Sequence, residues 1–457
     1  MATSPSTDTS TNPSLRTWVP GGNDNTLFPI QNLPYCVFLD PEDEYPSLGV
    51  RIGESIVNLN MLHEAGLIGD SEHHDHDVCD AFEMPMLNGL LGLPAAKRRE
   101  IRGQIQKFLL EGPPGGQSQR RVREKCLVSI DDTQLLMPMM VPNYTDFYAS
   151  IHHATNVGSM FRPDNPLLPN YKHVPIGYHG RASSIVVSGT PIKRPKGQQS
   201  PPDNDPSQGP SFGPCKMLDY ELELGAVIGD VNELGEPVAI ANARERIAGL
   251  TIVNDWSARD VQKWEYQPLG PFLAKNFATS IAPYITPIEA LEPFRCALDA
   301  RASGDPRPLP YLFDETDQRE GGFDIRLEVL LRTRQMRDAD APAHAISRGN
   351  FKHMYWTFAQ MIAHHTSNGC NLLPGDLLAS GTISGPDASS RGCLLELTWD
   401  GIDAGTGKPK PRKPLALPTG EQRTFLQDGD ELTMRAVCER TGYRTISLGE
   451  VVGVIEG

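Results

Sequence analysis

The amino-acid sequence predicts a mainly β (α+β) protein with two parts: a small mixed N-terminal domain, residues 1–140, and a large β-rich domain, residues 141–457. Most apolar stretches are short and are bounded by Gly, Pro or polar residues, which is typical of strands. Only two stretches have the length and the apolar spacing of helices. A change of composition near residues 138–143, where Met-Met-Val-Pro-Asn precedes a denser polar and aromatic block, marks the expected boundary.

The N-terminal part is expected to contain small strands and one clear helix. Short apolar runs broken by Pro and Gly between residues 28 and 57 predict the strands. The helix is predicted over residues 94–110, because a proline suits its first turn, Gly112-Pro-Pro ends it, and apolar residues recur at the spacing of one helix face. These apolar residues are Ile101, Ile105 and Leu109.

The C-terminal part is expected to be dominated by strands joined by long loops. Strands are predicted over residues 249–253, 323–331, 394–399 and 431–437, and a second helix over residues 351–366 before Gly369. Three segments rich in Pro and polar residues are interpreted as loops on the surface, at residues 191–214, 301–322 and 401–420.

Composition excludes several classes of protein. The net charge of −15 argues against nucleic acid as a general partner, because phosphate binding needs a basic surface. The eight cysteines lack paired short spacings and are interpreted as reduced thiols. We expect a cytoplasmic protein that does not bind a membrane, since no signal peptide is visible and the apolar runs are too short to span a bilayer. The histidine-rich tract at residues 72–77 is interpreted as solvated loop.

The segment Lys216–Gly225 alternates strictly between apolar and acidic residues. On a strand, residues two apart lie on one face about 6.6 Å from each other, so the carboxylates of Asp219, Glu221 and Glu223 are expected side by side. Clustered carboxylate oxygens suit Mg²⁺ or Ca²⁺. The alternative is a solvated strand face without a metal.

Two further segments bring residue types that catalysis uses. Asp146 stands shortly before the pair His152-His153, and a neutral imidazole oriented by a carboxylate is the natural general base near neutral pH. The spacing does not say which histidine it is. Asp255 follows an apolar strand and is either a fourth carboxylate of the cluster or the N-cap of a helix. Arg259 and Gln262, three residues apart, are expected to face the same way and to suit an oxyanion.

Four more residues complete the set. Lys275 lies between apolar residues, where a lysine usually meets a carboxylate or an anion, although a snorkelling surface lysine is the alternative. Glu396 lies in an apolar predicted strand and would form a carboxylate–histidine pair that acts as a general base if a histidine met it. Gly381 and Gly385 end another predicted strand and allow a close approach of the backbone to a ligand. Together these signals indicate a metal-assisted hydrolase.

Several longer blocks of sequence carry a resemblance to a known family. They are Tyr144-Thr-Asp-Phe-Tyr148, His153-Ala-Thr-Asn-Val-Gly158, residues 177–191 beginning Gly-Tyr-His-Gly-Arg, Asn254-Asp-Trp-Ser-Ala-Arg-Asp260, Trp264-Glu-Tyr266, Pro268-Leu-Gly-Pro-Phe-Leu273, Phe351-Lys-His-Met-Tyr-Trp356 and residues 377–385. In these blocks the chain closely resembles the fumarylacetoacetase family over residues 140–457, and more loosely over the N-terminal third.

The resemblance implies a function and an architecture. The implied reaction is hydrolysis of 4-fumarylacetoacetate, a small diketo acid, to fumarate and acetoacetate, the last step of tyrosine and phenylalanine catabolism. The implied architecture is a small SH3-like N-terminal barrel, a large β-rich C-terminal domain of the family's own fold, and a homodimer.

The resemblance also implies roles for individual residues. The implied ligands of Mg²⁺ or Ca²⁺ are Asp146, Glu221, Glu223 and Asp255, with Lys275 and Thr279 near the metal and Asp219 a neighbour that is not a ligand. His153 is implied as the general base, oriented by Glu396, which makes His152 dispensable. Arg259, Gln262 and Lys275 are implied to stabilise developing negative charge. The implied substrate contacts are Tyr148, Arg162, Tyr178, Tyr266 and Thr382, together with Arg259 and Gln262.

Some residues depart from the family pattern, and two other functions are compatible with it. Ala274 and Ala278 stand where glycines are usual, Ile151-His152 replaces another polar pair, and residues 402–419 are expected to be a surface insertion. One rival is another hydrolase, decarboxylase or isomerase of β-dicarbonyl acids from the wider superfamily. The other is a non-catalytic metal-binding or scaffold protein, which loss of a catalytic residue or ligand would mark.

Overall fold

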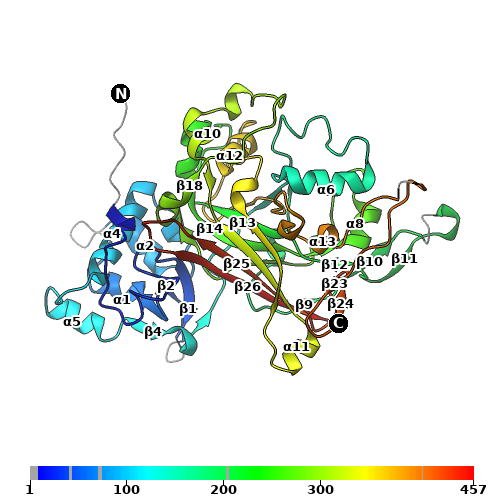
Figure 1. The fold of residues 1–457 in the computed structure, drawn as a ribbon. Coiled ribbons are helices and arrows are strands. Elements are labelled where there is room, and N and C mark those ends of the chain that lie inside the picture. The colour runs from blue at the N-terminus through cyan, green and yellow to red at the C-terminus, as the bar shows by residue number, and fades with distance from the viewer. Residues whose placement is uncertain (1–8, 41–43, 70–74, 202–204, 404) are drawn as a thin grey trace.

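The computed structural model describes residues 9–40, 44–69, 75–201, 205–403 and 405–457. Within these ranges, three larger sheets and several short helices build the molecule, which confirms the mixed α+β class. Figure 1 shows the N-terminal elements, in blue and cyan, gathered at one end, with strands β25 and β26 running from there under the rest of the chain.

The N-terminal part is an antiparallel sheet covered by helices. Its strand order is β4 (Leu127–Ser129), β3 (Ser55–Asn58), β2 (Ser47–Ile52), β1 (Tyr35–Leu39) and β5 (Gln134–Leu135). Its helices are α1 (Leu59–Glu64), α2 (His76–Glu83), α3 (Asn88–Gly92), α4 (Ala95–Leu109) and α5 (Gln117–Arg123). The small strands and the helix expected over residues 94–110 are therefore confirmed. Within the histidine-rich tract, residues 72–74 lie outside the described residues, whereas His76 and Asp77 begin α2, so the loop expected there is wrong for these two residues.

The central sheet of the larger part positions the site described below. Its order is β7 (Gly177–His179), β6 (Tyr144–Phe147), β22 (Leu377–Ala379), β13 (Leu222–Ile228), β14 (Ile247–Asp255), β16 (Thr279–Ile281) and β8 (Ile185–Val187), with β17 (Thr286–Pro287) also paired to β14. Both β13 and β14 are buried along their whole length, as their nearly continuous apolar sequences require.

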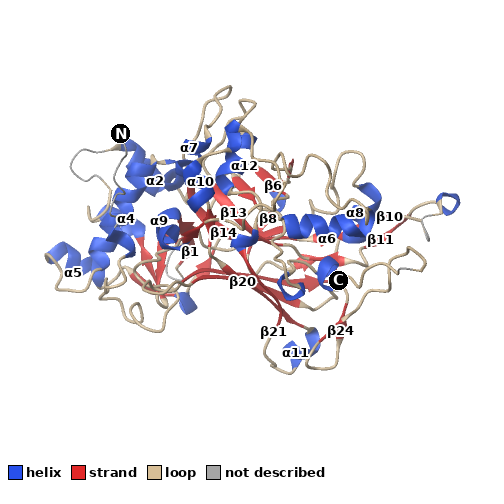
Figure 2. Cartoon of the chain, turned by 45° about the horizontal axis from the view of Figure 1, so that its top comes forward, coloured by secondary structure: helices blue, strands red, loops and turns tan. Residues whose placement is uncertain are grey.

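A second sheet packs against the central one. Its order is β21 (His344–Asn350), β20 (Arg326–Arg332), β25 (Glu431–Cys438), β26 (Ile446–Glu456) and β9 (Ile192–Lys193). The largest hydrophobic cluster joins Leu250 and Ile252 of β14 to Met434 and Val451 of this sheet. Helices α6 (Ile151–Phe161), α8 (Arg259–Glu265), α10 (Glu315–Glu320) and α12 (Phe358–His365) cover other parts of the domain, as Figure 2 shows.

The N-terminal part shares a core with the central sheet. One hydrophobic cluster contains Leu90 and Ile101 of the N-terminal helices together with Val253, Ile281 and Leu377 of the sheet. The backbones of Tyr35 and Ile285 also exchange two hydrogen bonds of 2.9 Å. The change of composition near residues 138–143 therefore marks a change of sheet and not a gap in the core.

Two predictions of secondary structure are wrong at the site. Residues 394–399 do not form a strand, because Leu394–Leu397 are a short helix, α13, whose first two N–H groups bind the side chain of Asp219. The alternating segment is also not one strand. It divides into β12 (Leu218–Asp219), which pairs with β15 (Ser257–Ala258), and β13, with a break at Tyr220-Glu221.

Other boundaries moved because of local hydrogen bonding. The helix expected over residues 351–366 begins only at Phe358, since Thr357 and Gln360 form a capping box, and a 3₁₀ turn occupies Phe351–His353. The segments interpreted as loops contain short elements, namely the hairpin β10 (Lys196–Gln199) and β11 (Ser211–Pro214), helix α10, and β23 (Leu415–Ala416), which pairs with β24 (Gln422–Arg423) just beyond the third segment. Both views show the hairpin projecting away from the body.

Two expectations about cysteines and membranes can be compared with the fold. All eight cysteines have free thiols. Among the described residues, no helix is long and apolar enough to cross a membrane.

Candidate active site

Four carboxylates converge at the ends of neighbouring strands. Asp146 comes from β6, Glu223 from β13 and Asp255 from the last position of β14, and Glu221 lies at the break before β13. One oxygen of each lies within 4.8 Å of the others, and all four side chains are buried. The alternative of a solvated acidic face is therefore wrong. The alternative of Asp255 as an N-cap is also wrong, because α8 begins at Arg259 with Ala258 before it.

Two cations partly compensate this negative charge. The Nζ atom of Lys275 lies 2.6 Å from Asp255 Oδ2 and 2.9 Å from Glu221 Oε2. The Nη1 atom of Arg259 lies 2.5 Å from Glu221 Oε1. Burial alone would lower the pKa of Lys275, but the two carboxylates more than offset this and raise it. Lys275 is thus a buried ion-pair residue and not a snorkelling one.

Among the described residues, no lysine or arginine forms an ion pair with the other two carboxylates. Oδ1 of Asp146 and Oε1 of Glu223 are buried without a hydrogen-bond partner. Burial, followed by the charge of neighbouring carboxylates, raises the pKa of Asp146 and of Glu223 well above the ordinary range. Unpaired carboxylate oxygens in a convergent set are the donors that Mg²⁺ or Ca²⁺ takes, so the residues present fit a hard divalent cation.

The backbone of Gly381 supports this cluster. Its N–H donates to Glu223 Oε2 over 3.2 Å. Its φ is +74°, and a Cβ atom at this position would lie 2.0 Å from the carbonyl oxygen of Phe147. Only glycine brings the backbone this close to the carboxylate without strain.

A histidine–carboxylate pair lies beside the cluster. His153, in the first turn of α6, has its Nδ1 atom 2.6 Å from Oε2 of Glu396 on α13. Burial would raise the pKa of Glu396, but His153 and the hydrogen bonds around the carboxylate lower it to about 2. The ionised carboxylate accepts the Nδ1–H of the imidazole, which leaves Nε2 as the acceptor of a proton.

Other donors fix Glu396 in place. Ser384 Oγ and Cys393 Sγ donate to Oε2 over 2.8 and 3.2 Å, and Asn156 Nδ2 donates to Oε1 over 2.8 Å. His153, Cys393 and Glu396 are close enough to hold a metal. Both carboxylate oxygens of Glu396 already accept hydrogen bonds, in contrast to the unpaired oxygens of the four-carboxylate cluster.

The structure distinguishes the two adjacent histidines. His153 is buried and pairs with Glu396, whereas His152 is half-buried and its ring lies 6.4 Å from that of His353. Burial, followed by the charge of His353, lowers the pKa of His152.

Arg259 and Gln262 do share one side of α8, as their spacing predicts. The Nη1 atom of Arg259 donates to Oε1 of Gln262 over 3.0 Å, so the amide nitrogen of Gln262 remains as a donor. The Nη2 atom of Arg259 is buried and has no hydrogen-bond partner in the described part of the chain. Two donors for an anion are therefore left available.

The implied substrate contacts divide into two groups. Three lie at the buried site: the Tyr148 ring meets His153 edge-on at 5.4 Å, Tyr178 donates to Asp255 Oδ2 over 3.2 Å, and the Thr382 hydroxyl is buried without a partner. The other two contact other residues. Arg162 is exposed and donates to the carbonyl of Pro166, and the half-buried Tyr266 lies 6.1 Å from the ring of Phe161.

Thr279 contacts a carboxylate of the cluster, and other contacts were missed at the sequence level. The Thr279 hydroxyl donates to Asp255 Oδ1 over 3.2 Å. Asn156 and Ser384 were not identified as partners of Glu396. Asn156 stands three residues after His153, the spacing of one helix face, and Ser384 lies in the glycine-rich turn, so a weak signal was present for both.

Comparison with known proteins agrees with this geometry. Residues 31–138 match the family model described as Fumarylacetoacetase N-terminal, and residues 143–454 match that described as Fumarylacetoacetate (FAA) hydrolase C-terminal. The chain is 45% identical to the fumarylacetoacetase of Bos taurus over 439 residues, which are 96% of this chain and 98% of the relative. It is also 45% identical to those of Arabidopsis thaliana (96% and 98% covered) and Homo sapiens (94% and 96% covered).

The close approach at Gly381 can be tested by adding one methyl group. Gly381→Ala is expected to lower the melting temperature and to weaken binding of a divalent cation. The added Cβ would clash with the Phe147 carbonyl and move the N–H of residue 381 away from the Glu223 carboxylate. The control is Gly401→Ala, since Gly401 has a φ of +89° but nothing within 4 Å of an added Cβ. It should show only the cost of a left-handed backbone, about 1–2 kcal/mol. Equal effects in the two variants would contradict the role of Gly381.

Proposed function

The chain belongs to the fumarylacetoacetase family, and from that premise we propose that it hydrolyses the carbon–carbon bond of 4-fumarylacetoacetate, giving fumarate and acetoacetate. The observation that carries the proposal is the presence, in one buried place, of a histidine–carboxylate pair, a four-carboxylate cluster and unpaired anion donors. Neither a scaffold nor a simple metal-binding protein requires all three.

The proposed cofactor is Mg²⁺ or Ca²⁺, held by Asp146, Glu221, Glu223 and Asp255. A cation held by these carboxylates would supply Lewis-acid polarisation to the oxygen atoms of the diketo acid. Lys275 and Thr279 both bind Asp255, so we propose that they position this carboxylate beside the metal. Lys275 is protonated through its two ion pairs and therefore acts as a charge and not as a ligand.

His153 is the proposed general base. With Nδ1–H held by Glu396, its Nε2 atom takes a proton from the water that attacks the carbonyl carbon of the fumaroyl group, which becomes a carboxylate of fumarate. The buried carboxylate of Glu396 stabilises the imidazolium that forms, as the acidic member of a catalytic triad does. The same proton is then available to the carbon of acetoacetate when the carbon–carbon bond breaks.

Three donors are proposed to meet the tetrahedral oxyanion. Arg259 offers Nη2, which has no protein partner, and Gln262 offers its amide nitrogen. Lys275 uses two of its three protons on carboxylates and has one left. Such donors act strongly because they are fixed in a water-poor site before the reaction starts.

The remaining substrate contacts are proposed from where their side chains lie in the structure. Tyr148 and Thr382 present a ring and a free hydroxyl at the buried site, and Tyr178 orients Asp255 while facing the same region. We propose Arg162 and Tyr266 as outer contacts, where the exposed guanidinium suits a terminal carboxylate of the diketo acid.

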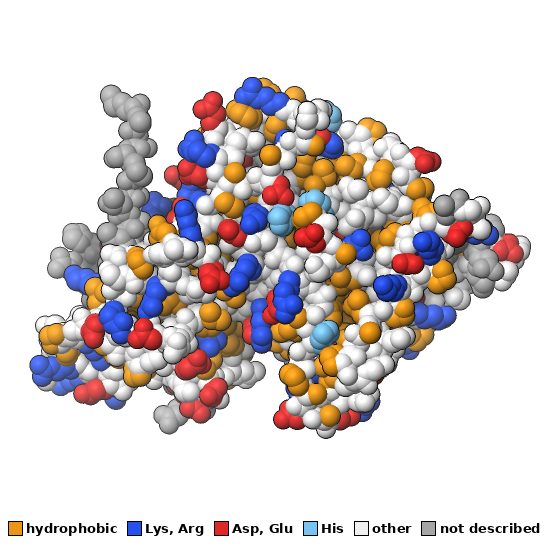
Figure 3. Space-filling model, in the orientation of Figure 1, with side chains coloured by type: hydrophobic (Ala, Val, Ile, Leu, Met, Phe, Trp, Pro, Cys, Tyr) orange, Lys and Arg blue, Asp and Glu red, His pale blue; other side chains and the backbone are white. Residues whose placement is uncertain are grey.

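We also propose a cytoplasmic homodimer acting in tyrosine and phenylalanine catabolism. Eight free thiols suit a reducing compartment. Large apolar side chains are exposed after α8 and at the end of α6, among them Leu269, Phe272 and Phe161, and Figure 3 shows apolar side chains at the surface over α6. Exposed apolar side chains that gather in one region are typical of surfaces covered in an assembly.

Turnover of the purified protein tests the reaction and the metal together. Protein stripped of metal by a chelator is expected to be inactive, and Mg²⁺ or Ca²⁺ should restore equimolar release of fumarate and acetoacetate. Consumption of substrate without equimolar products would favour another β-dicarbonyl reaction. Absence of turnover with any divalent cation would favour the scaffold function.

The raised pKa values of Asp146 and Glu223 predict a pH dependence of metal binding. Without metal these carboxyls hold protons at a pH where ordinary carboxyls are ionised, and a cation needs them ionised. Binding should therefore release protons, and the apparent affinity should rise with pH until both are ionised. Calorimetry in two buffers of different ionisation enthalpy measures the release. An affinity independent of pH would contradict this assignment.

Replacing Glu396 and, separately, His152 tests which histidine is the base. Glu396→Ala is expected to lower kcat by about 10²–10⁴-fold, because His153 loses the carboxylate that holds its tautomer. His152→Ala, the neighbouring control, should remain close to wild type, since its ring lies outside the pair. A larger loss in His152→Ala than in Glu396→Ala, measured side by side, would overturn the choice of base.

A further inference from the structure

We propose that Asp219 is a positioning residue that fixes the oxyanion donor Arg259 and the base-orienting Glu396 relative to each other. The inference rests on the proposed function, because it concerns the same site. It assigns a role to the one carboxylate of the alternating segment that stands outside the metal cluster.

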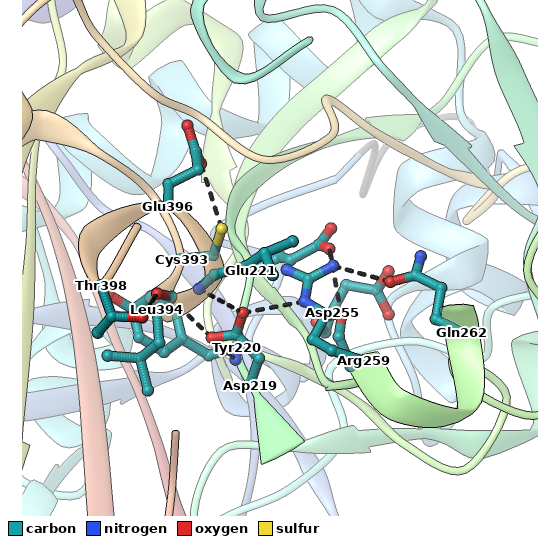
Figure 4. Close-up of polar contacts among 12 residues, drawn as sticks. Asp219, Tyr220, Glu221, Asp255, Arg259, Gln262, Cys393, Leu394, Glu396 and Thr398 are labelled. Carbon is teal, nitrogen blue, oxygen red and sulfur yellow. Dashed lines mark hydrogen bonds and ion pairs between the residues drawn. The ribbon is translucent and has the colours of Figure 1, made fainter. Parts of the chain in front are cut away.

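The side chain of Asp219 is fully buried, and each of its hydrogen-bond partners among the described residues is a donor. Oδ2 accepts from Nε of Arg259 and from the N–H of Leu395, both over 2.9 Å. Oδ1 accepts from the N–H of Leu394 over 2.8 Å and from the N–H of Tyr220 over 2.9 Å. Figure 4 shows this carboxylate between the start of α13 on one side and Arg259 on the other.

The first consequence concerns the orientation of Arg259. Asp219 binds Nε, whereas Glu221 and Gln262 bind Nη1. A planar guanidinium held on two of its three nitrogens has one orientation. The third nitrogen, Nη2, is the one that remains unpaired and buried. Asp219 thus helps to determine which donor is free for a developing anion.

The second consequence concerns Glu396. The two N–H groups that Asp219 accepts are the first two of α13, and Glu396 follows in the same turn. Backbone N–H groups at the start of a helix have no partner within the helix, so an acidic side chain there fixes where the turn begins. Asp219 therefore sets the position of the carboxylate that orients His153.

These two connections pass through a single carboxylate. Arg259 follows β15, which pairs with β12, and Glu396 comes from a segment more than 130 residues later in the chain. Loss of Asp219 would remove one anchor from each group at once, because no hydrogen bond among the described residues joins Arg259 directly to α13. Since the four donors already occupy its oxygens, Asp219 does not need a metal.

The test is Asp219→Asn with Asp430→Asn as the matched control. Asn has the shape of Asp, but its NH₂ group would face a donor, and the charge is lost. Asp430 is also fully buried, binds Nε of Arg423 over 2.9 Å and accepts from the N–H of Gln427 over 2.9 Å, yet it lies in another part of the chain. Both variants remove a buried Asp–Arg pair, but only the first affects the site.

In Asp219→Asn we expect kcat to fall about 10²-fold or more with KM within about threefold, since an oxyanion donor acts in the transition state. Asp430→Asn should lower the melting temperature but leave kcat at the wild-type level. The loss from Asp219→Asn should be smaller in Arg259→Ala and in Glu396→Gln backgrounds, because residues that act as one unit are not additive.

Several results would overturn the inference. They are a kcat near wild type in folded Asp219→Asn, an equal loss in Asp430→Asn, or full additivity with both backgrounds. If Asp219→Asn does not fold, Asp219→Glu keeps the charge but displaces it by one methylene, and the same split of kcat from KM is expected. An unchanged kcat in that variant would refute the role.

A crystal structure of Asp219→Asn separates this inference from the proposed reaction. The guanidinium of Arg259 and the turn Leu394–Glu396 are expected to shift, whether or not the wild-type protein hydrolyses fumarylacetoacetate. If the wild-type protein shows no turnover, the proposed function fails, but the crystal structure of Asp219→Asn still tests the positioning role of Asp219. Both groups in their original positions would overturn the positioning role.

Discussion

The site depends on an excess of buried negative charge. Asp146, Glu221, Glu223 and Asp255 converge in one place, and Lys275 and Arg259 compensate only part of their charge. Isolated carboxylates in a protein interior are costly, so they either hold protons or hold a cation. The raised pKa values of Asp146 and Glu223 indicate that these two carboxyls favour the protonated form when no cation is bound. The same imbalance makes a divalent cation a natural component of the site.

The surrounding fold supplies the rigidity that such a cluster needs. Strands β6, β13 and β14 bring the acidic residues from three distant segments, and the sheet is buried on one face against the large core and on the other against the N-terminal helices. Like charges at this separation repel one another, so their positions must be imposed by packing. The N-terminal part thus contributes to the site indirectly, by covering the central sheet.

Two kinds of polar group lie side by side and differ in how well they are satisfied. Glu396 has donors on both oxygens, and Asp219 accepts four hydrogen bonds, so the positions of these carboxylates are fixed. Asp146, Glu223 and the Nη2 atom of Arg259 instead have buried atoms without partners. Satisfied groups orient their neighbours, whereas unsatisfied ones are available to a cation or a substrate. This contrast separates positioning residues from binding residues.

The sequence by itself determined the α+β class, the helix over residues 94–110 and most residues of the site, because local apolar spacing and residue type carry that information. Only the tertiary structure decided that Asp255 ends a strand and that residues 394–397 are helical. Spacing alone left His152 and His153 open, the family resemblance selected His153, and the structure places it against Glu396. The helix at residues 394–397 shows the physical reason. Asp219, 175 residues away in sequence, binds the N–H groups that begin the turn, and no local pattern reports such a long-range hydrogen bond.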